Sequence, residues 1–141
     1  MSALSVAEDV ARAAVAGLAV RALVNGELPE RSLPALLATL TPRHRPPRFV
    51  TIPTSTRLAL RSVDVVAARA VGPGTCLFRS LARYAALRQA RVAARFVIGV
   101  APDPAGGDFV AHAWVEVGGE PVFEASPPRY SETFCWPERE G

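Results

Sequence analysis

The stretch that decides the fold is Gly72-Pro73-Gly74-Thr75-Cys76-Leu77-Phe78-Arg79-Ser80-Leu81, a turn followed by an apolar, helix-forming run. Thr75 is a good N-cap, because its hydroxyl can accept a hydrogen bond from a backbone N–H that the first helical turn leaves unpaired. The glycines and the proline stop any earlier helix. The pattern predicts a helix over residues 76–89 that begins with Cys76.

A thiol at the start of a helix lies near the positive end of the helix dipole and near free N–H groups. Both favour the thiolate, which is the form that attacks carbonyl groups. Cysteine is also a small apolar residue that is often buried, so its position alone leaves a structural role open. Cys76 is therefore a candidate nucleophile that needs a base from elsewhere in the chain.

The composition indicates one globular domain over residues 1–141, because half of the residues are hydrophobic and 21% are charged. All 16 basic residues are arginine, which is typical of a bacterial genome rich in G and C. The net charge of +3 comes without the basic stripe and interleaved aromatic residues of a nucleic-acid binder. Two cysteines are too few for a disulfide scaffold, although one bridge between Cys76 and Cys135 stays open. Neither a signal peptide nor a membrane span is recognisable, so we expect a cytoplasmic protein.

The hydrophobic period divides the chain into two parts. Helical spacing predicts helices over residues 5–24, from the Ser32 cap to about residue 40, and over 55–70, with a basic, proline-rich connector over 41–54. After the cysteine helix the period becomes two and predicts strands over 95–100, 109–117 and 121–125. We divide the domain into a helical N-terminal region with its connector (1–54), a catalytic core (55–126) and an irregular tail (127–141). This is an α+β fold in which helices pack on a small antiparallel sheet.

His112 supplies the candidate base. In a strand over 109–117 it shares one face with Trp114 and Glu116, while Val115 lies on the core face. Glu124 on the next strand is a carboxylate that could orient the imidazole, which completes the three roles of a cysteine peptidase or acyltransferase. A two-residue loop at Gly118-Gly119 would turn Glu124 away from His112, so this interpretation predicts a hairpin loop of odd length.

Three segments taken in order, Cys76-Leu77-Phe78-Arg79-Ser80-Leu81, Arg95-Phe96-Val97-Ile98-Gly99-Val100 and Ala111-His112-Ala113-Trp114-Val115-Glu116, resemble the transglutaminase-like cysteine peptidases of lasso-peptide biosynthesis. The resemblance is specific over about residues 55–125. It implies a papain/transglutaminase-like fold and an enzyme that removes the leader from a ribosomally made precursor peptide, before a separate cyclase closes the macrolactam. It also implies the split form of the enzyme, without a recognition domain of its own, and hence a separate small leader-binding protein as partner.

By this resemblance Cys76 is the nucleophile and His112 the general base. The third member is usually Asp in the family, and Glu124 stands at the matching place, with Asp108 and Glu116 as alternatives. Arg79 and Trp114 are candidate substrate-binding residues; a structural ion pair is the other role open to Arg79 and to Arg83.

Two further functions stay open. An amine-accepting transglutaminase or amidotransferase would use the same residues, and a non-catalytic peptide-binding scaffold would use none of them. The two histidines and two cysteines show no zinc-ligand spacing, and the chain has no phosphate-binding glycine loop, so we expect neither a metal nor a cofactor.

Overall fold

The computed structural model describes residues 32–71, 76–124 and 130–139. This part of the chain holds three helices: α2 (Leu33–Leu40), α3 (Thr54–Val71) and α4 (Cys76–Gln89). One antiparallel sheet follows, with strands β1 (Ala94–Pro102), β2 (Phe109–Val117), β3 (Glu120–Pro121) and β4 (Ser131–Trp136) in the spatial order β3-β2-β1-β4. The helix predicted over 5–24 and the Thr75 cap lie outside the described residues.

The helices predicted within the described residues are confirmed. The Ser32 hydroxyl caps α2 by accepting a hydrogen bond from the Ala35 N–H at 3.4 Å, and Pro34 lies in the first turn, where its missing N–H costs nothing. Helix α4 begins at Cys76 and ends at Gln89, as the turn and the apolar run predict. The proline-rich connector forms no helix of its own and no extended strand. Its contacts with the sheet region include an isolated bridge between Phe49 and Val92 and a hydrogen bond that Trp136 Nε1 donates to the Thr41 hydroxyl oxygen.

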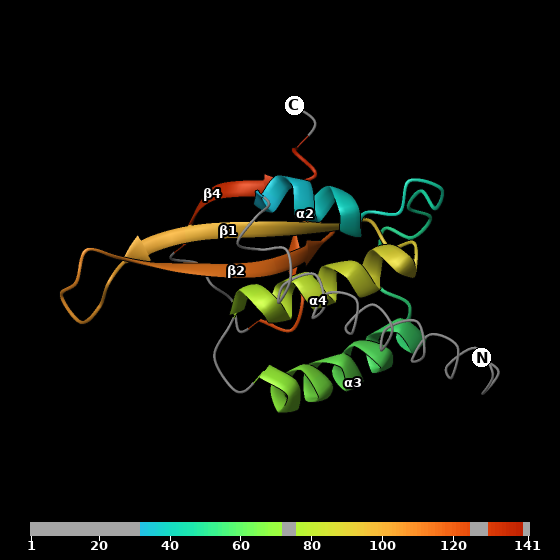
Figure 1. Cartoon of the computed structure of the whole chain (residues 1–141), viewed down its shortest axis with the longest axis horizontal. Helices are drawn as coiled ribbons and strands as arrows, with labels where there is room; N and C mark the ends of the chain where they lie inside the picture. The colour runs from blue at the N-terminus through green and yellow to red at the C-terminus, as the bar shows by residue number, and fades with distance from the viewer. Residues whose placement is uncertain (1–31, 72–75, 125–129, 140–141) are drawn as a thin grey trace.

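Helix α4 is the centre of the fold. Figure 1 shows it between α3 and the strands β1 and β2, and it also contacts α2. Leu81, Tyr84 and Leu87 have no exposed surface, and Phe96 of β1 and Val115 of β2 meet them from the sheet side. Each such aliphatic side chain contributes about 1.5–3 kcal/mol when it is fully buried. The first residue of α4 is therefore attached to the best-packed element of the domain.

The prediction of an irregular tail is wrong for residues 131–136, which form β4 and pair with the outer side of β1. Phe134 and Trp136 pack against the core, whereas Cys135 lies between them on the other face. Only six residues alternate in this way, and prolines flank them on both sides. A short strand between prolines gives too few repeats of the two-residue period to be distinguished from a loop.

The hairpin after β2 has the register that the sequence interpretation disfavoured. Val117 pairs with Glu120, so Gly118 and Gly119 form a two-residue loop, and the prediction of an odd-length loop is wrong. Both glycines have positive φ, 61° and 82°, and such a loop matches the twist of the flanking strands better than a longer one. The predicted third strand is also shorter than expected, because β3 ends at Pro121.

Candidate active site

One side of α4 carries three polar or reactive side chains, Cys76, Ser80 and Arg83, at positions i, i+4 and i+7. Residues with this spacing lie above one another on a helix. Ser80 has no exposed surface, and its hydroxyl donates a hydrogen bond to the carbonyl oxygen of Ala113 in β2 at 2.8 Å. This side of α4 therefore faces β2.

The contact with Ala113 lies at the edge of β2, just beyond the point where β3 ends. The Val115 carbonyl accepts a hydrogen bond from the Val122 N–H at 2.8 Å, so it points toward the β3 side. Backbone carbonyls two residues apart on a strand point the same way, and the Ala113 carbonyl therefore points to the same edge and meets Ser80. Cys76 lies one helical turn before Ser80, about 6 Å along the axis. The fold thus brings the start of α4 to the stretch of β2 that carries His112.

The imidazole of His112 is held on two sides. Its Nε2 lies 3.2 Å from Oε2 of Glu124. Its ring stacks on Trp114, with centroids 6.0 Å apart and planes at 18°, and lies 5.3 Å from the ring of Tyr130. A carboxylate at Nε2 favours the tautomer that carries the proton there and leaves Nδ1 as a proton acceptor. This is the state that a general base for a nearby thiol requires.

Glu124 reaches His112 through a backbone turn at Phe123. In the observed register Glu116, which shares the face of His112, pairs with Pro121, so regular alternation would place Glu124 on the other face. Phe123 has a φ of 54°, a left-handed conformation that is uncommon for a large residue. It ends the alternation directly before Glu124, so the carboxylate joins the His112 side although the hairpin loop has two residues.

Arg83 connects Glu124 to α3. Its Nη1 donates to Oε1 of Glu124 at 3.2 Å and to the carbonyl oxygen of Val122 at 3.3 Å. Its Nε and Nη2 donate to the two carboxylate oxygens of Asp64 at 2.8 and 2.9 Å. The guanidinium is 5% exposed, so these bonds are largely shielded from water. The ion pair that the sequence left open for Arg83 is present, and its two partners converge on the candidate site.

Sequence reasoning missed Asp64 and Ser80. Asp64 had a visible signal, because it is the one acidic residue of α3, whose other charged residues are all arginine. Ser80 had none, since a serine inside a helix is ordinarily a neutral choice.

The remaining sequence candidates lie as follows. Trp114 is 5% exposed, and its Nε1 donates to Oε1 of Glu116 at 3.1 Å. Oε2 of Glu116 lies 3.3 Å from Nη2 of Arg139, so this carboxylate is occupied on both sides. Arg79 is exposed on α4, and Asp108 is exposed in the loop before β2. Of the three candidate carboxylates, Glu124 is the one in contact with His112.

The carboxyl end of the described chain adds a second charge cluster. Nη2 of Arg139 lies 2.6 Å from Oε2 of Glu132, and this hydrogen bond holds the pKa of Glu132 below its ordinary value. Arg139 also contacts Glu116, which accepts the hydrogen bond from the Trp114 indole. The tail therefore stabilises the face on which the imidazole lies.

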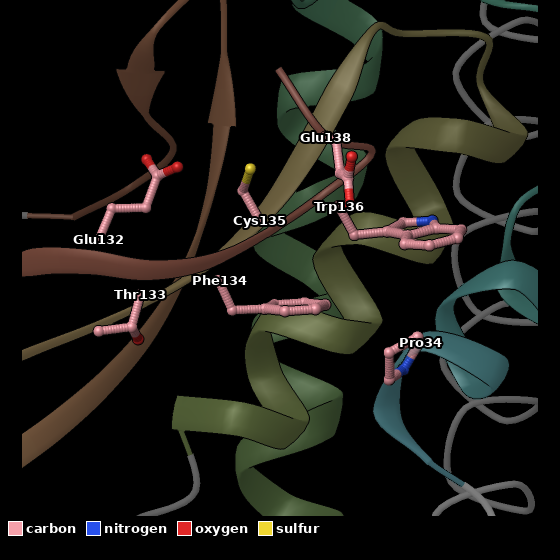
Figure 2. Close-up of a pocket in the computed structure, with 7 residues that line it drawn as sticks. All are labelled: Pro34, Glu132, Thr133, Phe134, Cys135, Trp136 and Glu138. Atoms are coloured by element: carbon pink, nitrogen blue, oxygen red, sulfur yellow. The ribbon is translucent and has the colours of Figure 1, made fainter. Parts of the chain in front are cut away.

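The second cysteine occupies a different surface. Cys135 lines an open hollow of about 370 Å³ with residues of β4 and α2, in which the Phe134 and Trp136 rings extend toward the helices and the Cys135 sulfur points elsewhere (Figure 2). Nη2 of Arg95 lies 2.8 Å from this sulfur, and no histidine lines the hollow. Both cysteines are free thiols, so the bridge between them is not formed. Because no imidazole lines this hollow to take the proton of the thiol, the candidate nucleophile remains Cys76.

The described residues offer neither a metal site nor a membrane-spanning helix. They contain no cluster of three His, Cys, Asp or Glu side chains that could hold a metal ion. No helix among them has the length and apolar character needed to cross a membrane.

The chain matches a protein-family model over most of its length. A family model described as the transglutaminase-like superfamily matches residues 8–134, which include α2 to α4 and nearly the whole sheet. Curated proteins and solved structures give no match.

Proposed function

This chain belongs to the transglutaminase-like superfamily, which includes cysteine peptidases and transglutaminases, and we propose that it is a cysteine peptidase. The observation that carries the proposal is the 3.2 Å contact between His112 Nε2 and Glu124, at the strand edge where the Cys76 helix begins. An imidazole oriented by a carboxylate beside a helix-start thiol is the arrangement that activates a cysteine for attack on a carbonyl.

The proposed mechanism is acyl transfer to water. Nδ1 of His112 takes the proton of the Cys76 thiol, and Glu124 stabilises the resulting imidazolium. The thiolate attacks the peptide carbonyl, and the backbone N–H of Cys76, in the first turn of α4, supports the oxyanion. The imidazolium then gives its proton to the departing amine. Water, deprotonated by His112, hydrolyses the thioester and regenerates the thiol.

The proposed substrate is the leader of a ribosomally made lasso-peptide precursor. The resemblance of the Cys76, Arg95 and His112 segments to leader peptidases supports this choice. So does the edge of β2 from Phe109 to Ala111, which has no strand beside it in the described part of the chain, because an extended peptide can pair with a free strand edge. Exposed Arg79, one turn after Cys76, could contact an acidic group of the peptide. Buried Trp114 fits better as a support for the imidazole than as a substrate contact.

The proposal includes partners and a compartment. The enzyme acts in the cytoplasm with a separate leader-binding protein, and a separate cyclase uses the released core peptide. It needs no cofactor, because the thiol, the imidazole and water supply the whole reaction.

Mass spectrometry of a candidate precursor, incubated with this protein and a leader-binding partner, tests the proposal. Wild type and Cys135→Ala, the matched control, should cleave one bond, and Cys76→Ala should cleave none. Products that carry an added amine in place of water would show a transglutaminase or amidotransferase. Equal cleavage by Cys76→Ala, or no cleavage together with no selective alkylation of Cys76, would favour a peptide-binding scaffold.

A further inference from the structure

We propose that Arg83 and Asp64 form a positioning pair that fixes the Glu124 carboxylate against His112. The pair touches neither the imidazole nor any reacting atom. Its effect on cleavage rests on the proposed function, but its effect on the state of His112 can be measured without a substrate.

The hydrogen bonds of Glu124 fix the rotation of its carboxylate. The two oxygens of Glu124 have different partners, Arg83 at Oε1 and His112 at Oε2. Arg83 cannot turn away from Oε1, because its other two nitrogens, Nε and Nη2, are held by the two oxygens of Asp64. Such a planar fork sets direction as well as distance. The carboxylate is thereby rotated so that Oε2 faces the ring.

The charges of the contacting groups also favour a positioning role for the pair. Asp64, Arg83, Glu124 and protonated His112 alternate in sign along one chain of contacts. A guanidinium alone beside Glu124 would weaken the attraction of this carboxylate for the imidazolium. Asp64 offsets that charge, so Glu124 keeps its effect on His112 while it is held in place.

Arg83 also contacts the backbone turn at Phe123 that precedes Glu124. The centroid of the Phe123 ring lies 5.3 Å from the guanidinium carbon of Arg61 and 5.7 Å from that of Arg83. Arg83 also bonds the carbonyl of Val122, directly before it. The residue that positions Glu124 from the side therefore also supports the left-handed turn that brings Glu124 into reach.

The test uses the fact that the chain has two histidines. Nitrogen-15 NMR of the full-length protein, at a pH where both rings are neutral, reports which ring nitrogen carries the proton. His44, exposed in the connector, is an internal reference that should not change between variants. In wild type we expect the His112 proton on Nε2, whereas Arg83→Met should give a mixture of tautomers. Arg83→Lys and Asp64→Asn should lie in between.

Cleavage should follow the same order. For Arg83→Met we expect kcat to fall on the order of 100-fold, the effect of misplacing a catalytic group by about 1 Å. KM should stay within about threefold, because the pair does not touch the peptide. Arg88→Met is the matched control, since Arg88 lies on the same helix, is also buried and has an Nε without a hydrogen-bond acceptor. It should leave the tautomer unchanged.

An unchanged His112 tautomer in folded Arg83→Met would overturn the proposal, and so would an equal change in Arg88→Met. If Arg83→Met does not fold, Arg83→Lys and Asp64→Asn decide by the same criterion. A wild-type protein that cleaves no precursor would refute the proposed function, whereas the NMR result would still confirm or refute the positioning pair.

Discussion

Replacing Ser80 with alanine tests the contact that joins the two halves of the site. The change removes the hydrogen bond to the Ala113 carbonyl and leaves that acceptor without its partner, at a cost of about 1–3 kcal/mol. Alanine favours helix more than serine and returns about 0.5 kcal/mol. The net loss of about 0.5–2.5 kcal/mol should lower the unfolding midpoint by roughly 2–10 °C for a domain of this size.

The effect on activity should exceed the effect on stability. Ser80 lies one turn after Cys76, and Ala113 follows His112 directly, so the lost bond should loosen Cys76 relative to the imidazole that we propose as its base. We expect cleavage to fall more than tenfold at a temperature where the variant remains folded, because small misplacements of reacting groups are costly. Ser55→Ala is the control, as Ser55 is also buried but makes no side-chain hydrogen bond within the described residues. A Ser80→Ala protein with wild-type melting and wild-type cleavage would refute the reasoning.

Three further predictions concern the surroundings of the imidazole. Gly99→Ala should cost about 1–3 kcal/mol and reduce cleavage, because the new Cβ would lie 2.8 Å from Cη2 of Trp114 and push that ring against the imidazole; thermal unfolding and cleavage assays check this. Glu124→Asp should lower kcat on the order of tenfold, although aspartate is usual in the family that the sequence resembles, since the shorter side chain loses one of its two contacts. Glu132 should stabilise the folded state fully above its ordinary pKa of 4.5, and this stabilisation should disappear as the pH falls through the lowered pKa of the folded state. Acid unfolding of Glu132→Gln should lack this component; an unchanged pH dependence would contradict it.

The elements with long, regular periods could be predicted from the sequence. Helix α4 follows from a turn and a run of 14 helix-forming residues, and β2 from nine residues that alternate. The same local rules selected Cys76 and His112 as candidates, because a helix start and a strand face are properties of short segments. The six residues of β4 were too few to show a two-residue period, and contact with β1 decides its structure.

The supporting contacts of the site could not be predicted, because they depend on distant segments. Asp64 and Glu124 are 60 residues apart and meet only through Arg83. The Ser80 hydroxyl finds its acceptor 33 residues later. Periodicity shows which side of a helix is buried, but it does not show which strand atom that side will meet.

For Glu124 the predicted loop length was wrong, but the predicted contact with His112 is present. The alternation rule required an odd-length loop if the carboxylate was to face His112, and the loop has two residues. The rule assumes that the returning strand stays extended, and Phe123 leaves the extended region two residues after β3 ends. Glu124 follows this turn directly, and its side chain contacts both Arg83 and the imidazole. The glutamate side chain has one methylene group more than aspartate, which adds about 1.5 Å of reach. The left-handed Phe123 and the longer side chain of glutamate thus act together to bring the Glu124 carboxylate to His112 in this register.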